Sequence, residues 1–169
     1  AFSYGIQQDK RDRVFMPTDG YVSAFSQTLP VYADSPYFKN TYKFAGYESF
    51  TKNVIGSIKF YASSITGIGE KDVRISKRIY LPQQRLRGFK KIGPKDGQDY
   101  VGGNYATAIN FEAALPYFLP ENTKTDVGLF LDFGNVWEVD YDSSVEDSKI
   151  QIIEIGFRFL SNSKLYGPF

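Results

Sequence analysis

The chain has 169 residues, of which 42% are hydrophobic, 17% aromatic and 23% charged. Its 13 Tyr, 15 Phe and 1 Trp are too many aromatic residues for a disordered tail, and 20 Lys and Arg against 19 Asp and Glu leave no broad positive surface for nucleic acid. The absence of Cys and His excludes disulfides, Cys/His zinc sites and Ser-His-Asp or Cys-His catalysis within the chain. No apolar run reaches the ~18 residues of a membrane-spanning helix. We therefore expect no metal and no cofactor, and only carboxylate or lysine chemistry stays open.

Apolar and polar residues alternate with a period of two along much of the chain, which predicts an almost entirely β fold. In chain order, the predicted strands span residues 1–11, 20–32, 37–52, 53–67, 104–116, 124–138 and 148–161. Turn-forming residues separate them, such as the stretch from Pro17 to Gly20 and the pair Lys52 and Asn53. The pattern favours antiparallel hairpins.

The connection at residues 68–103 differs from the others. It lacks convincing alternation and is far longer than the ~2–5 residues of an ordinary hairpin loop. A loop of this length indicates a functional role.

The alternation also assigns ionisable side chains to one face of the last three predicted strands. Glu112 and Asp132 each lie on the opposite parity from the aliphatic and aromatic stripe of their strand, and so do Glu154 and Arg158. We expect these four residues to share a polar face.

Two architectures fit this alternation: a soluble sandwich or barrel with its apolar face inward, and an outer-membrane barrel with its apolar face toward lipid. The polar face carries many Gly, Ala, Ser and Asn with isolated charges, whereas a solvated face would be rich in Lys, Glu and Arg. The long strands and the aromatic residues near strand ends, including Trp137, also suit a tilted membrane span. The composition favours the membrane barrel.

Four strings occur in a fixed order along the chain. They are the stretch from Asp9 to Gly20, with charged residues followed by Pro17-Thr18; Leu86-Arg87-Gly88-Phe89; Gly102-Gly103-Asn104; and the stretch from Phe130 to Trp137. This series resembles the C-terminal barrel of the BamA family of outer-membrane assembly factors, a part of the bacterial surface antigen superfamily.

The resemblance implies roles for particular residues. The long loop would fold back into the barrel lumen with the tip Arg87-Gly88-Phe89, and Arg87 would pair with the carboxylates of Asp132 and Glu112. A guanidinium makes bidentate, charge-assisted hydrogen bonds to a carboxylate, Gly88 permits a tight turn, and Phe89 supplies an apolar anchor. The motif glycines would be Gly102, Gly103 and Gly134.

Simpler interpretations stand beside these roles. Arg87 alone could be a surface charge, and Glu112 with Asp132 could be a carboxylate pair of the glycosidase type. Gly102 and Gly103 could form a turn before a strand. The charged run from Asp9 to Arg13 is by default a solvated strand end, with salt bridging within the family motif as the alternative.

The resemblance further implies that residues 1–169 are one partial barrel domain, about seven strands of a barrel of about sixteen, without its earlier strands, its periplasmic POTRA domains and its closing strand. The implied function is the insertion and folding of β-barrel proteins in the outer membrane of a Gram-negative bacterium, with no enzymatic step. The implied partners are outer-membrane lipid, nascent β-barrel proteins, accessory assembly lipoproteins and periplasmic chaperones, and no nucleic acid. A related translocation or secretion pore and a soluble all-β binding module are the alternatives.

Overall fold

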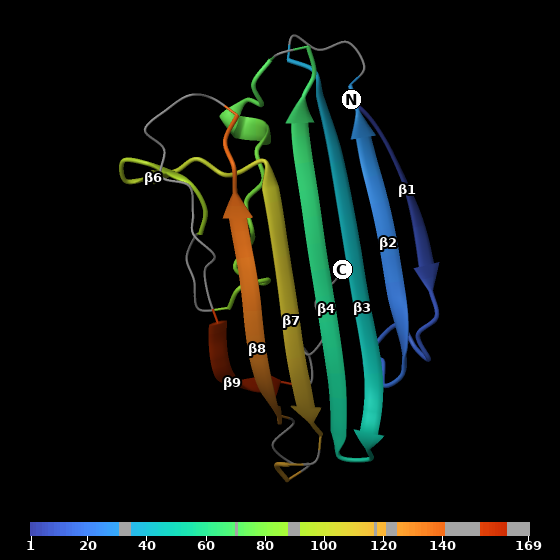
Figure 1. Cartoon of the computed structure of the whole chain (residues 1–169). Helices are drawn as coiled ribbons and strands as arrows, with labels where there is room; N and C mark the ends of the chain where they lie inside the picture. The colour runs from blue at the N-terminus through green and yellow to red at the C-terminus, as the bar shows by residue number, and fades with distance from the viewer. Residues whose placement is uncertain are drawn as a thin grey trace.

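The computed structural model describes residues 1–30, 35–69, 71–87, 92–116, 118–120, 125–140 and 153–161, with the backbone alone described for 125 and 153–161. Within this part of the chain, seven long strands form one antiparallel sheet in the order β1-β2-β3-β4-β7-β8-β9 (Figure 1). They are β1 (Phe2–Asp9), β2 (Gly20–Leu29), β3 (Tyr37–Thr51), β4 (Val54–Gly67), β7 (Tyr105–Leu115), β8 (Thr125–Trp137) and β9 (Ile153–Ser161). The predicted all-β, antiparallel fold is confirmed, and residues 148–152 of the last predicted strand lie outside the described residues.

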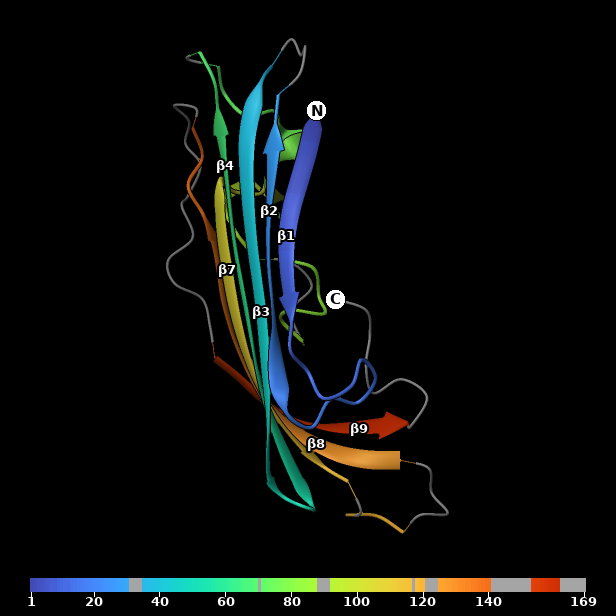
Figure 2. The ribbon, with the colours of Figure 1, turned by 90° about the vertical axis from the view of Figure 1, so that its right-hand side faces the viewer.

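Each strand pairs with the next long strand along the chain, and the long connection between β4 and β7 keeps this order. The tightest connection is the turn at Lys52 and Asn53 between β3 and β4, where the register shifts between Ser49 and Thr51. Seen from the side, the sheet is a curved, open wall, and β8 and β9 turn away from the line of β1 to β4 at its lower end (Figure 2). No helix among the described residues is long and apolar enough to cross a membrane.

The segment between β4 and β7 covers one face of the sheet, which we call the inner face. It holds a short 3-10 helix, η1 (Ile75–Lys77), and a small hairpin of β5 (Lys95–Asp96) and β6 (Asp99–Tyr100). This hairpin was not predicted, although Asp96-Gly97 is a turn signal, because two-residue strands are too short to show alternation.

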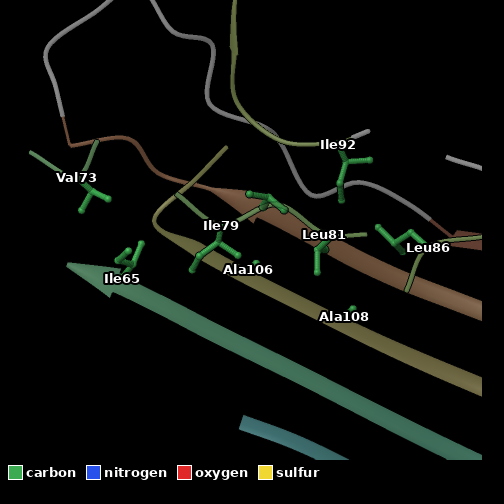
Figure 3. Close-up of a cluster of buried hydrophobic side chains, with 9 residues drawn as sticks. Ile65, Val73, Ile79, Leu81, Leu86, Ile92, Ala106 and Ala108 are labelled. Atoms are coloured by element: carbon green, nitrogen blue, oxygen red, sulfur yellow. The ribbon is translucent and has the colours of Figure 1, made fainter. Parts of the chain in front are cut away.

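The main hydrophobic core lies between this loop and the inner face. Figure 3 shows loop side chains meeting residues of β4, β7 and β8. The loop contributes Val73, Ile79, Leu81, Leu86 and Ile92, and the sheet contributes Ile65, Ala106, Ala108 and Val136. Because alanines line the wall here, the loop backbone can approach the sheet closely and fill the space that larger side chains would occupy.

The opposite, outer face of the sheet carries large apolar side chains that the described chain leaves uncovered. The relative exposures of Ile6 and Phe50 are 74% and 70%, and Tyr42, Phe111 and Leu129 are also exposed on this face. An exposed apolar surface of this extent indicates a face that meets lipid or a partner rather than water.

One register row of the outer face is polar and aromatic. It runs across neighbouring strands through Tyr4, Gln27, Asn40, Ser64, Tyr105 and Trp137. Gln27 Nε2 donates to Asn40 Oδ1 at 2.7 Å, and the rings of Tyr105 and Trp137 stack with centroids 5.8 Å apart. Such a row has the composition of the aromatic girdle at a membrane interface.

The charged run in the β1–β2 connection makes ion pairs, which is the alternative interpretation of that stretch. Arg11 Nε and Nη2 donate to the two carboxylate oxygens of Asp9 at 2.8 and 2.6 Å. Asp12 accepts hydrogen bonds from the backbone N–H and the hydroxyl of Thr18 at 2.9 and 2.8 Å. Most of this run is exposed, as expected for a solvated strand end, and the ion pairs of the alternative interpretation form on that exposed turn.

Candidate functional site

The predicted polar face is the inner face, and the register brings its ionisable residues close together. Asp132 of β8 pairs in register with Asn110 of β7 and with Glu154 of β9, while Glu112 lies two positions along β7 from Asn110. Arg158 pairs in register with Gly128. The backbone therefore confirms the shared face, and the side chains of Glu154 and Arg158 lie outside the described residues.

Arg87 lies against both of the carboxylates named from the sequence. Its Nη2 and Nε donate to Asp132 Oδ1 and Oδ2 at 2.6 and 2.8 Å, and its backbone N–H donates to Oδ2 at 3.2 Å. Its Nη1 donates to Glu112 Oε2 at 3.1 Å. The guanidinium thus makes a bidentate pair with one strand and a single bond with its neighbour, a geometry that fixes the loop across β7 and β8.

The three side chains of this cluster are largely buried. The Asp132 side chain is completely buried, and those of Arg87 and Glu112 are 18% and 13% exposed. Burial opposes the charge of Arg87, but hydrogen bonds and attraction from Asp132 and Glu112 outweigh it and raise the pKa of Arg87 above its ordinary value. The guanidinium also lies 4.0 Å from the ring centroid of Phe130 on the same face.

Sequence reasoning missed two neighbours of this cluster. Asn110 Nδ2 donates to Asp132 Oδ1 at 2.9 Å and to the Arg85 carbonyl at 2.7 Å, so it joins the buried carboxylate to the loop backbone. Arg85 in turn stacks on Tyr61 of β4 with 4.0 Å to the ring centroid. The parity of Asn110 and Glu112 was the available signal, because an amide two residues from an inward carboxylate lies on the same face.

The motif glycines allow the loop to approach β8. A side chain at Gly134 would put its Cβ 2.8 Å from Leu86 Cδ1, and one at Gly103 would lie 2.5 Å from the carbonyl oxygen of Trp137. Gly102 has a φ of +71°, which favours glycine, and its neighbour Gly103 forms an isolated β-bridge with Ile79. Gly88 and Phe89 lie outside the described residues.

The cluster joins the loop to two neighbouring strands of the inner face. Among the described residues, no group of three His, Cys, Asp or Glu side chains is arranged to hold a metal ion. The guanidinium of Arg87, held between carboxylates of two adjacent strands, attaches the loop to the sheet.

Comparisons with known proteins identify the family of the chain and its fold. The sequence pattern of the Omp85 superfamily domain matches residues 1–158. A SAM50-like protein of Schizosaccharomyces pombe is 31% identical over an aligned length of 130 residues, and the match covers 69% of this chain and 26% of that protein. The crystal structure of BamA from Haemophilus ducreyi lacking POTRA domains 1–3 shares the fold with a TM-score of 0.72 and 23% identity, over 80% of this chain and 29% of that chain.

The chain spans about a quarter of each of these two proteins. The pattern match covers nearly all of the described strands, including both carboxylates that contact Arg87. The chain belongs to the Omp85 superfamily, and its sheet is part of a barrel wall of the BamA kind.

Proposed function

We propose that the protein to which this chain belongs inserts and folds β-barrel proteins in an outer membrane, with residues 1–169 forming part of its barrel wall. The observation that carries the proposal is the docking of the loop on the inner face through Arg87, Asp132 and Glu112 in a chain of this superfamily. The loop would brace the wall from inside while the outer face meets lipid.

The outer face supports a membrane setting over a soluble binding module. Ile6, Phe25, Phe111 and Leu129 lie exposed on it and have no cover from the described chain. Transferring such side chains from water to lipid is favourable by ~25 cal/mol for each Å² of apolar surface removed from water.

We propose no covalent step for this function. Glu112 and Asp132, the pair considered for sugar hydrolysis, are both engaged by Arg87, whereas hydrolysis needs a carboxyl group free to give a proton to the substrate. The work would instead be templating, in which backbone N–H and C=O groups at a strand edge pair with an incoming strand.

The proposed setting is the outer membrane of a Gram-negative bacterium, with outer-membrane lipid, nascent β-barrel proteins, assembly lipoproteins and periplasmic chaperones as partners. Since the sequence relative is fungal, the source membrane is part of the proposal. Fractionation of the native cells, followed by affinity purification of the full-length protein, tests the membrane and the partners together.

The decisive experiment replaces Arg87 in the full-length protein. We expect Arg87→Gln to lower the level of folded β-barrel proteins in the membrane, measured by heat-dependent gel mobility, because Asp132 and Glu112 lose their shared partner. Arg13→Gln is the matched control, since Arg13 makes a more exposed pair with Asp12 at 3.4 Å. Normal levels of folded barrels in the Arg87→Gln strain would contradict the proposal.

The alternative of a translocation or secretion pore gives a different outcome. Deleting residues 68–103 would then raise channel conductance and leave barrel assembly unchanged, because the loop would act only as a plug. We expect assembly to fall in the deleted protein even where heat-dependent mobility shows that its own barrel still folds.

A further inference from the structure

A second arginine of the loop is held by a second carboxylate, away from the Arg87 cluster. Arg78 Nη2 donates to Asp140 Oδ1 at 3.0 Å, and the Arg78 side chain is only 1% exposed. The other oxygen of Asp140 accepts the backbone N–H of Val73 at 2.8 Å. Arg78 Nε closes the ring by donating to the Val73 carbonyl at 3.2 Å. One carboxylate therefore holds both ends of the turn that contains η1.

The position of Asp140 shows which part of the sheet holds this turn of the loop. It lies three residues beyond the end of β8, the strand that carries Asp132. Glu138, with a φ of +63°, redirects the chain at this point, and the carbonyls of Trp137 and Glu138 both accept the backbone N–H of Asn104, at 3.1 and 2.8 Å. These bonds fix the end of β8, so that Asp140 lies against Val73 and Arg78 at the start of the loop.

The loop between the two arginines is packed rather than suspended. Ile79 is tied to Gly103 by two backbone hydrogen bonds of 2.9 and 3.0 Å, and Ile79, Leu81 and Leu86 belong to the core formed with the inner face (Figure 3). Residues 79–86 form a strap, defined by these contacts, with Arg78 at one end and Arg87 at the other.

We propose that Arg78 and Asp140 form a second clasp that positions the strap, and with it the Arg87 tip, on the inner face. Both are positioning residues, because they hold the strap and so place Arg87 against its carboxylates. The inference rests on the proposed function only for the effect on barrel assembly. Release of the loop would require both clasps to open, since Arg87 ties one end of the strap to β8 and Arg78 ties the other end to Asp140, just beyond that strand.

The test uses two buried alanines of the inner face as reporters in the full-length protein. Ala108 belongs to the core beneath the loop, and Ala45 belongs to a separate cluster with Val22 and Tyr47; both are 0% exposed. Each is changed to Cys in a background without other cysteines, and its rate of labelling by a soluble maleimide is measured in native membranes.

We expect Asp140→Asn to speed labelling at position 108 by about tenfold or more, the fold-change of losing one charge-assisted hydrogen bond, and to leave position 45 unchanged. Asparagine keeps an acceptor for the Val73 N–H, so the effect isolates the ion pair. Asp140→Glu restores slow labelling, and Arg13→Gln has no effect. Unchanged labelling at 108, or equal acceleration at 45 and 108, would overturn the proposal.

Assembly is measured in the same strains, so that the two proposals can fail separately. Fast labelling at 108 in Asp140→Asn with normal assembly would uphold the second clasp and count against the bracing role. Slow labelling at 108 in Asp140→Asn, together with impaired assembly in Arg87→Gln, would overturn the second clasp and uphold the function.

Discussion

The two faces of β7 and β8 are built from alternate residues of the same strands, yet they differ in the size, polarity and exposure of their side chains. Inward positions carry small and polar residues such as Ala108, Asn110 and Asp132, and they are buried because the loop covers them. Outward positions carry large apolar residues, of which Phe111 and Leu129 are exposed. In a water-soluble sheet the large apolar face would be the buried one. The reversal shows that the loop, rather than a second sheet, supplies the core of this wall.

The largest effect is expected where the inner face loses its buried charge partner. Asp132→Ala leaves Arg87 with Glu112 alone and Asn110 without its carboxylate, and removing one side of a buried pair costs about 3–5 kcal/mol. We expect a correspondingly lower unfolding midpoint in urea for the full-length protein in lipid vesicles, and a detached loop. An unchanged midpoint would show that the cluster does not hold the two strands and the loop together.

A charge placed on the outer face comes next in size. Leu131→Arg puts a guanidinium where lipid is proposed to lie, which costs about 2–4 kcal/mol near the middle of the bilayer. Ala114→Arg, on the inner face and at the end away from the loop, is the control and should cost little. The two variants are compared by urea unfolding in vesicles, and equal costs would remove the distinction between the faces.

Much of this contrast could be predicted from the sequence, but only for the strands, where apolar and polar residues alternate. Alternation located the strands and put Glu112 and Asp132 on one face, because each strand residue reports its own side. Arg87 could be identified as the partner of those carboxylates only from the family resemblance, because the sequence of an irregular loop does not show where the loop folds. Arg78 and Asp140 are 62 residues apart and lie outside any alternating segment, so no local pattern joins them.

A smaller effect is expected from filling the space where the loop approaches β8. Gly134→Ala would place a Cβ within 2.8 to 3.0 Å of three side-chain carbons of Leu86. Overpacking of this kind costs about 1–3 kcal/mol. We expect faster proteolysis of the loop in the variant, and recovery when Leu86→Ala is added. Failure of the second substitution to restore resistance would mean that Leu86 does not pack on Gly134.

The smallest of these effects concerns a single amide on each face. Asn110→Ala removes bonds to a buried carboxylate and to the Arg85 carbonyl, and we expect a loss of about 1–2 kcal/mol. Asn40→Ala removes outer-face bonds to Gln27 at 2.7 Å and to Ser64 at 3.5 Å, neither of them to a charged group, and should cost less. Urea unfolding of both variants gives the order, and a larger loss for Asn40 would contradict it.

The position of the loop itself can be measured by cross-linking. Leu86→Cys is combined with Gly134→Cys in a full-length protein without other cysteines, and the disulfide is followed by gel mobility in native membranes after mild oxidation. The matched control pairs Leu86→Cys with Phe133→Cys, which lies next to Gly134 on the outer face. We predict a high yield of the 86–134 disulfide and none of the 86–133 disulfide. No cross-link at 134, or equal yields at 133 and 134, would show that the loop does not lie on the inner wall.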